Sequence, residues 1–174
     1  MTNKLKNIMK ELEQGSNLKI LNESFSNEIV SNQSVGCSIL GGTTFHKVNF
    51  RDIDFTGSNI VACKFKDCTF DNVVLVKCEF WDSSFENCQI KECNLVRSNF
   101  YGSKFRNCNF TNVDLSASYF SNFEFIETKF KNSQLDFLTF DSVTISRSKQ
   151  SVEVGDLSSF KKILKKMNFI LEDS

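Results

Sequence analysis

The chain carries no net charge, because its 21 Lys and Arg residues equal its 21 Asp and Glu residues. A balanced chain produces no strong field that would attract nucleic acid or an anionic membrane. The sequence also lacks an apolar run long enough to cross a bilayer and the apolar core and cleavage site of a secretory signal. We therefore expect no direct nucleic acid binding and no membrane contact. The inward cysteines described below indicate a reducing and hence cytoplasmic compartment.

Catalytic motifs are scarce as well. The one histidine, His46, stands beside Lys47 and has no nucleophile or metal ligand at a characteristic spacing. The chain has no Gly-rich phosphate loop, no HExxH segment and no nucleophile elbow. Its acidic residues are scattered among lysines and form no carboxylate pair. The sequence therefore predicts that the protein is not an enzyme and holds no cofactor and no metal.

A repeat of five residues runs from Thr43 to Phe140. Every fifth position from Phe45 to Phe140 holds Phe fourteen times, Leu four times and Ile twice. The residue two places earlier is nearly always small, as in Cys63 or Ser83. A fixed repeat indicates a repeat architecture, and a period of five matches neither a helix nor a flat strand. Each unit is therefore expected to be a short extended piece followed by a turn.

The turn has its own residue preference. Two places after each large residue, Asn, Asp or Gly occurs in eleven of the twenty units. These residues tolerate unusual backbone angles or bond their own backbone, which suits them to turns. Inward and outward positions are thus separated within each unit, and the chain should wind into a coil.

Several units resemble the consensus of the pentapeptide repeat family, A(D/N)LXX: CKFKD, CTFDN, SSFEN, SNFYG, CNFTN and VDLSA. Phe replaces Leu at the centre, and Cys or Ser replaces Ala, which keeps the large residue beside a small one. The resemblance covers about three-fifths of the chain. It implies an all-β solenoid, the right-handed quadrilateral β-helix, with four units in each coil. The terminal segments described below add capping α-helices at both ends to this expected fold.

Stacking residues twenty apart predicts four ladders of inward side chains. We number the four sides of the rod by their first regular residue: Phe45 on the first, Phe50 on the second, Phe55 on the third and Ile60 on the fourth. With coils about 4.8 Å apart, the regular coils of residues 43–145 give a rod about 25 Å long. Phe123 and Leu138 are large for the small inward position, which predicts a wider or bent rod near its C-terminal end.

Residues 1–15 are expected to form an N-terminal capping helix. Thr2 or Asn3 can cap its start, and Gly15 stands where a C-terminal cap belongs. Its apolar face consists of Leu5, Ile8, Met9 and Leu12. A solenoid generally needs such a cap, because its last coil exposes apolar side chains and unpaired backbone groups.

Residues 16–148 are assigned to the β-helix, with an imperfect first coil over 16–42. Large apolar residues there keep the phase of five, but Glu23, Glu28 and Gln33 occupy inward positions. Cys37 is expected to be outward and partly exposed.

Residues 149–174 are expected to carry a second amphipathic helix, over 156–171, with Asp156 or Ser158 as its N-cap. Four lysines lie opposite its apolar stripe, and such lysines most often form a solvated face: Lys161, Lys162, Lys165 and Lys166. The stripe comprises Leu157, Phe160, Ile163, Leu164, Met167, Ile170 and Leu171. The helix is either a cap on the last coil or a dimerisation element. Family members that bind DNA gyrase are similar in pairing through their C-terminal ends.

Six of the seven cysteines occupy the small inward position: Cys63, Cys68, Cys78, Cys88, Cys93 and Cys108. Buried cysteine behaves as a compact apolar residue. Neighbouring thiols on one ladder point in parallel, so no disulfide is expected among them.

Two functions remain open at this point. The first is a non-catalytic rod that acts as a protein-interaction or structural module with an unknown protein partner. The second comes from the family resemblance: a DNA-mimicking protein that binds DNA gyrase and gives resistance to quinolone-type inhibitors. The balanced charge of the rod gives that alternative little support.

The outward aromatic residues suggest where a partner would bind. Trp81 and Tyr101 are twenty apart on the fourth side, so they should stand one above the other, with Tyr119 one coil further on. Val61 extends this row, and Val76 and Val96 point outward on the adjoining third side. Such pairs can simply support each other across strands, but Trp and Tyr are enriched at interface hot spots. We expect these six residues to bind a second copy, as a homodimer through the aromatic face, or another protein.

Overall fold

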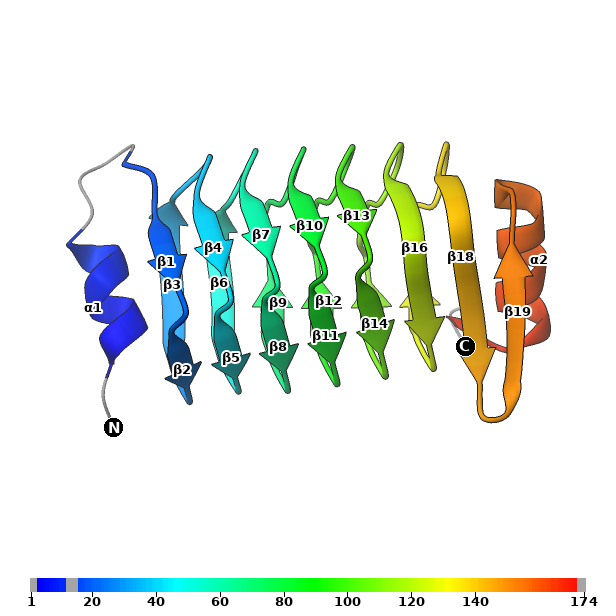
Figure 1. Ribbon diagram of the computed structural model, residues 1–174, viewed down its shortest axis with the longest axis horizontal. Coiled ribbons are helices and arrows are strands. Elements are labelled where there is room, and N and C mark those ends of the chain that lie inside the picture. Colours follow the sequence, from blue (N-terminus) through cyan, green and yellow to red (C-terminus); the bar gives the residue numbers. More distant parts are fainter. Residues whose placement is uncertain (1–2, 12–15, 172–174) are drawn as a thin grey trace.

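The protein is a rod of stacked coils with a helix at each end (Figure 1). The computed structural model describes residues 3–11 and 16–171. Helix α1 (Lys4–Lys10) covers one end and helix α2 (Leu157–Lys166) the other, and the coils between them are joined by parallel strand pairing. The expected β-solenoid with two terminal helices is confirmed.

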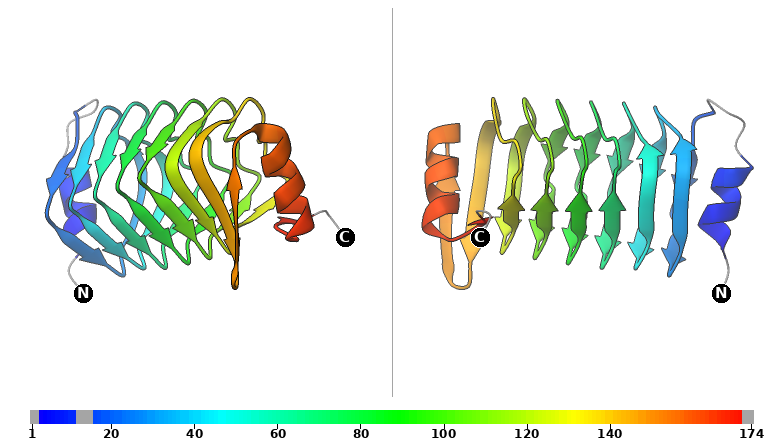
Figure 2. Two further views of the ribbon diagram at one scale, coloured as in Figure 1. Left: turned by 45° about the vertical axis from the view of Figure 1, so that its right-hand side comes forward. Right: turned by 180° about the vertical axis from the view of Figure 1, so that it is seen from behind.

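Two sheets form the walls of the rod among the described residues (Figure 2). The larger sheet makes the fourth and first sides and contains β1 (Lys19–Leu21), β2 (Ser24–Ser26), β4 (Ile39–Gly41), β5 (Thr44–His46), β7 (Asn59–Val61), β8 (Lys64–Lys66), β10 (Glu79–Trp81), β11 (Ser84–Glu86), β13 (Asn99–Tyr101), β14 (Lys104–Arg106), β16 (Tyr119–Ile126), β18 (Thr139–Arg147) and β19 (Gln150–Val154). The smaller sheet makes the second side and contains β3 (Ile29–Ser34), β6 (Asn49–Asp54), β9 (Thr69–Asp71), β12 (Gln89–Lys91), β15 (Asn109–Thr111), β17 (Lys129–Lys131) and β20 (Ile170–Leu171). Isolated bridges join the coils on the third side.

The register between regular coils is twenty residues. Phe45 lies opposite Phe65 on the first side, and Phe80 lies opposite Phe100 on the fourth. The second and third sides keep the same spacing. The four predicted ladders are therefore confirmed, with four five-residue units in each coil.

The turn at each corner requires a left-handed backbone. All twenty residues that follow a central residue by two, from Lys47 to Ser142, have φ between 48° and 71°. Gly, Asn and Asp adopt this region at little cost, which explains their preference for it. The same region also holds Phe137, whose bulky side chain makes it an outlier.

Stacked phenylalanine rings fill the interior. Phe80 and Phe100 lie 4.5 Å apart between ring centroids, nearly parallel, and Phe65 and Phe85 lie 4.6 Å apart. Aromatic pairs of this kind contribute about 0.5–1.5 kcal/mol beyond their buried area. Small residues such as Cys63 fill the space beside them and are fully buried.

Helix α1 closes the N-terminal end of the rod. Leu5 and Met9 are buried against the first coil, and Ile8 is partly buried. The helix ends at Lys10, and Asn3 takes the N-cap position without a side-chain hydrogen bond. The other predicted members of this helix, Thr2, Leu12 and Gly15, lie outside the described residues.

The acidic residues of the first coil face this helix. Lys4 Nζ lies 2.5 Å from Glu23 Oε2, and the Lys6 N–H donates to Glu28 Oε2 at 3.1 Å. Glu28 is buried at an inward position although its side chain is acidic. The first coil thus departs from the repeat pattern because its inward acids bond helix α1. Cys37 of the same coil is exposed, as expected.

The last coils depart from the regular shape. Strand β16 runs unbroken from Tyr119 to Ile126 through the corner that separates β13 from β14 in the coil before (Figure 1). Phe123 is buried in this corner, with its ring 5.2 Å from that of Phe105. The large side chain fills the corner, so the two sides merge into one long strand.

Helix α2 covers the C-terminal end. Asp156 is its N-cap and accepts from the Ser159 N–H at 2.8 Å, as expected of a cap. Phe160 and Leu164 are fully buried, and the Phe160 ring lies 4.8 Å from that of Phe140. Phe160 and Leu164 of the apolar stripe are therefore packed within one chain.

The predicted extent of this helix is wrong at its C-terminal end. The helix stops at Lys166, since Asn168 takes φ of 55° and the Phe169 N–H bonds the Leu164 carbonyl. Ile170 and Leu171 then form β20, with Ile170 opposite Phe130. Strand β20 therefore forms the second side of the last coil. In the sequence, β19 and α2 lie between it and β18. Neither helix of the described residues has the length and hydrophobicity to cross a membrane.

Candidate functional site

Three aromatic side chains form a stack on the outside of the fourth side. Trp81 on β10 lies opposite Tyr101 on β13 in the parallel register. Their ring centroids are 4.0 Å apart and their planes differ by 18°. Tyr119, on β16, meets Tyr101 edge to face at 5.7 Å. The structure thus brings together the three aromatic residues predicted from their spacing, and we call Trp81, Tyr101 and Tyr119 the aromatic strip.

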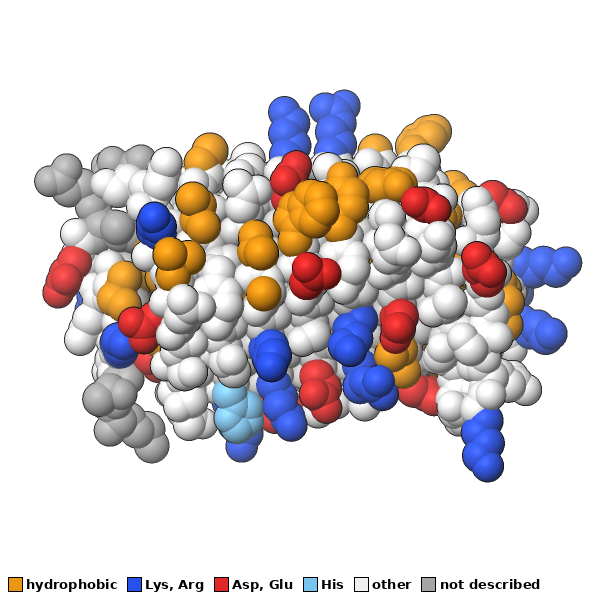
Figure 3. All heavy atoms as spheres, viewed as in Figure 1, with side chains coloured by type: hydrophobic (Ala, Val, Ile, Leu, Met, Phe, Trp, Pro, Cys, Tyr) orange, Lys and Arg blue, Asp and Glu red, His pale blue; other side chains and the backbone are white. Residues whose placement is uncertain are grey.

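The apolar surface continues toward the N-terminal end of the same side. Val61 lies opposite Trp81 in the register and is 40% exposed. Leu21 on β1 lies in the same row two coils earlier, with Gly41 between them, and is 46% exposed. Ile39 on β4 lies nearby, opposite Asn59, and is 42% exposed. Figure 3 shows hydrophobic side chains gathered along this part of the surface. Ile39 and Leu21 were missed from the sequence, although they stand one and two coils before Val61.

Val76 and Val96 occupy a different place. Both are half-buried and belong to the third side, one coil apart. The corner residues Lys77 and Arg97 follow them in the chain, each with a left-handed backbone. Val76 and Val96 therefore lie beside the aromatic strip, across this corner, and do not belong to its row.

Only one of the side-chain polar groups in the aromatic strip forms a hydrogen bond within the described part of the protein. Trp81 Nε1 donates to Glu79 Oε2 at 3.3 Å. The hydroxyls of Tyr101 and Tyr119 make no hydrogen bond to any other described residue. An incoming group can therefore accept a hydrogen bond from either phenol.

The single histidine belongs to a small surface pair. His46 Nε2 lies 3.2 Å from Asp67 Oδ2, and both side chains are partly exposed. A hydrogen bond from Asn87, together with His46, lowers the pKa of the Asp67 carboxyl. No group of three or more His, Cys, Asp or Glu within residues 3–11 and 16–171 is arranged to hold a metal ion.

The cysteines are held as free thiols. Six are buried, and Cys37 is exposed. Burial raises the pKa of Cys78 and of Cys93 to about 12. Hydrogen bonding along the ladder with Cys88, and burial, raise the pKa of Cys68 well above its ordinary value. Cys68, Cys78 and Cys93 therefore stay protonated and unreactive near neutral pH.

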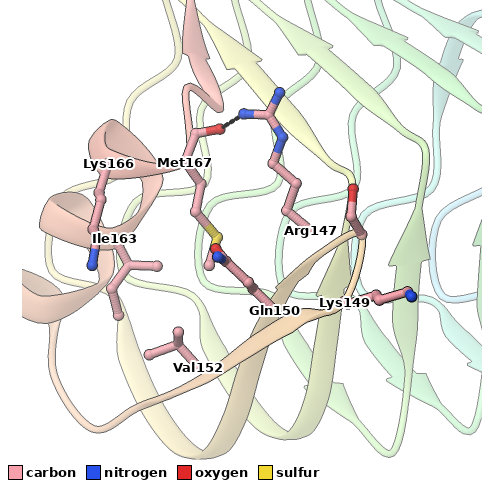
Figure 4. Close-up of a pocket in the computed structure, with 8 residues that line it drawn as sticks. Arg147, Lys149, Gln150, Val152, Ile163, Lys166 and Met167 are labelled. Atoms are coloured by element: carbon pink, nitrogen blue, oxygen red, sulfur yellow. Dashed lines mark hydrogen bonds between the residues drawn. The ribbon is translucent and has the colours of Figure 1, made fainter.

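A groove of about 650 Å³ lies between the β18–β19 hairpin and α2 (Figure 4). Its floor includes Val152, Ile163 and Met167. Arg147 is committed to the Met167 carbonyl and to the Phe169 ring. Lys149 points away from Arg147, and Lys166 lies across the groove. The cations do not converge on one point, so the groove is a poorer site for an anion than its composition suggests.

The fold and the site together define a class: a repeat solenoid whose distinctive outward feature is an apolar and aromatic row. The chain belongs to the pentapeptide repeat family, whose model, Pentapeptide repeats (8 copies), matches residues 40–72, 68–107 and 108–147. No functionally curated protein matches the chain.

Among solved structures, the chain is similar to trypsin-treated QnrB1, a plasmid-mediated fluoroquinolone resistance protein, at 19% identity over 75% of this chain and 72% of that chain, with a TM-score of 0.44. It is similar to HetL of the cyanobacterium Nostoc sp. strain PCC 7120, involved in heterocyst differentiation regulation, at 11% identity over 75% and 87%, with a TM-score of 0.36. A pentapeptide repeat protein of the Arabidopsis thaliana thylakoid lumen matches at 19% identity over 66% and 74%, with a TM-score of 0.29. These likenesses assign no function to the chain.

Proposed function

We propose that the protein is a non-catalytic rod that binds a protein partner through the aromatic strip and the apolar row beside it. The observation that carries this proposal is the stack of Trp81 on Tyr101, with Tyr119 at its edge, on the outside of a rigid sheet. Trp and Tyr are enriched among the residues that dominate binding energy at protein interfaces. A rigid strand platform holds them without the ordering cost that a loop would incur.

Mutual support between strands does not account for the whole surface. Stacking gives about 0.2–1 kcal/mol for a cross-strand pair and explains Trp81 with Tyr101. It does not explain why Val61, Leu21 and the nearby Ile39 on the same side are each two-fifths or more exposed. Contiguous apolar patches on soluble proteins usually mark contact surfaces.

We also propose a cytoplasmic location. Six buried cysteines form no disulfide and fill the core as apolar residues, which suits a reducing compartment. Partner capture should therefore use native cytoplasm under reducing conditions.

The test is capture of partners by the intact protein and by the double variant Trp81→Ala, Tyr101→Ala. The proposal expects at least one protein to bind the parent and to be lost with the double variant. The matched control is Phe137→Ala, which removes an exposed aromatic ring, 78% exposed, that lies outside the aromatic strip, at a corner near the C-terminal end of the rod. A double variant that keeps every partner overturns the site.

Self-association is tested in the same samples by sedimentation. Trp81 is the only tryptophan, so its emission reports directly on burial of the strip. A parent that is monomeric at high concentration, with fully water-exposed emission, excludes a homodimer through this face and leaves a different protein as the partner.

A further inference from the structure

The side next to the aromatic strip carries an excess of positive charge. Lys64 and Lys66 on β8, and Lys104 and Arg106 on β14, are all exposed on the first side. Within the part of the chain that the structure describes, none of these four side chains forms an ion pair or a hydrogen bond. We call these four residues the cationic band.

Two acids lie within and beside the cationic band. Glu86 on β11 lies between Lys66 and Arg106 in the register, and Glu124 on β16 lies opposite Lys104. On the first side, the outward positions of these four strands therefore carry four cations against two acids. Asp82 stands at the corner toward the strip, and Glu79 is bonded to Trp81. Because the whole chain has equal numbers of basic and acidic residues, the positive excess is local to this face.

The cationic band and the aromatic strip belong to one continuous surface. Both are carried by the larger sheet, whose strands β10 and β11 are consecutive in the chain. Figure 3 shows the Lys and Arg side chains below the hydrophobic row in the same view. A partner broad enough to cover both sides would meet apolar side chains and positive charge together.

The orientation of the aromatic rings, like the positive charge beside them, favours a partner with oxygen acceptors. Trp81 and Tyr101 stack face on face, which covers one face of each ring and leaves its rim open to a partner. The rim of an aromatic ring carries partial positive charge and its face partial negative charge. The free hydroxyls of Tyr101 and Tyr119 are hydrogen-bond donors as well. Rims, phenols, ammonium groups and a guanidinium all favour oxygen acceptors.

Resting on the function proposed above, we infer that the partner of the aromatic strip is an acidic protein segment. Its apolar side chains lie on the row from Val61 to Tyr119, and its carboxylates lie on the cationic band. Carboxylates that meet β8 and β14 stand two coils apart, about 9.6 Å. Charge of this kind speeds encounter and selects the partner more than it adds affinity.

A nucleic acid fits this surface less well. Bases bind single-stranded sites by stacking on open aromatic faces, and the facing surfaces of Trp81 and Tyr101 are occupied by each other. Glu86 and Asp82 also lie where phosphates would run. The nucleic acid and a second copy of the chain are therefore outcomes to be measured against the acidic segment.

The test uses two synthetic amphipathic peptides with one leucine stripe in common and no tryptophan. The first carries Glu at its remaining positions and the second carries Lys. Each is titrated into the intact protein while the emission of Trp81 is followed. We expect the acidic peptide to shift the emission and to bind at least about fivefold more tightly than the basic one. Its binding should weaken as salt rises from about 50 mM to about 500 mM.

Charge reversal on the cationic band gives the decisive variants. Lys64→Glu with Lys104→Glu should weaken the acidic peptide at least about fivefold. The matched control, Lys91→Glu with Lys129→Glu, makes the same change on the exposed second side and should leave binding unchanged. All four positions are exposed, so unaltered circular dichroism and denaturation midpoints are expected and are measured first.

Several results overturn the inference without touching the proposed function. They are equal binding of the two peptides, no binding of either, an unchanged affinity after reversal of the band, tighter binding of a single-stranded oligonucleotide, or a dimer seen by sedimentation without peptide. The proposed function is decided separately, by partners that the Trp81→Ala, Tyr101→Ala variant fails to capture.

Discussion

At the scale of single residues, the backbone conformation at the corner position allows each five-residue unit to turn onto the next side. Every corner residue of the regular coils adopts a left-handed backbone, although nine of the twenty are neither Asn, Asp nor Gly. An ordinary residue in this region costs about 1–2 kcal/mol, and less for Asn or Asp. The rod therefore tolerates several unfavourable corners because its core supplies the free energy to hold them.

Phe137 is the corner residue for which this cost is least compensated. Its φ is 57° and its side chain is 78% exposed, so it gains little from burial. We expect Phe137→Asn to raise the free energy of unfolding by about 0.5–1 kcal/mol, because Asn adopts the left-handed region more easily. Denaturation midpoints measure this. Phe137→Leu removes the ring but keeps an ordinary residue at the corner, and an equal gain there would show that backbone strain is not the cause.

The buried thiols predict how stability depends on pH. In the unfolded chain a cysteine ionises near its ordinary pKa of 9.0, whereas Cys78 and Cys93 keep their protons in the fold up to about 12. Between these values the unfolded state binds fewer protons, so stability falls as pH rises above about 9. The double variant Cys78→Ala, Cys93→Ala should lose part of this slope in denaturation series at pH 8 and at about pH 10.5. An identical slope in the variant would place the thiols in contact with water.

At the scale of elements, the helix at the N-terminal end acts as a lid on the first coil. Replacing Leu5 and Met9 by Ser should release α1, since these two side chains are its buried contacts. We expect aggregation through the uncovered coil edge and not the loss of a chemical activity. Light scattering and sedimentation measure it. Asn7→Ser with Lys10→Ser changes the exposed face of the same helix and should stay monomeric. A soluble, equally stable Leu5→Ser, Met9→Ser variant would show that α1 is not a cap.

The elements that were predictable are those that repeat. The twenty-residue register placed Phe80 over Phe100 and Trp81 over Tyr101 before any coordinates were needed. Strand β20 was not predictable, because Ile170 pairs with a residue forty positions earlier, after a hairpin and a helix that follow no period. Ile39 and Leu21 were overlooked because the acids at inward positions in the first coil obscured its regularity.

At the scale of the whole molecule, the distribution of charge bears on the two functions that the sequence left open. A DNA mimic presents negative charge to its target, whereas this rod presents the cationic band beside its most apolar surface. We therefore expect no inhibition of DNA gyrase supercoiling and no protection of gyrase from quinolone-type drugs. The measurement is a supercoiling assay with and without drug, with heat-denatured protein as the control. Relief of drug inhibition at stoichiometric protein would contradict this expectation.

The register also restricts changes in the length of the rod to whole coils of twenty residues. Removing a single five-residue unit between Trp81 and Tyr101 would rotate every later residue by a quarter turn about the rod and carry Tyr101 onto a different side. Removing or duplicating a whole turn of twenty would keep all four sides in line and change only the length. The outward surface can therefore be lengthened or shortened by whole turns without losing its alignment, which limits how insertions and deletions can alter this chain while preserving the row of side chains on its fourth side.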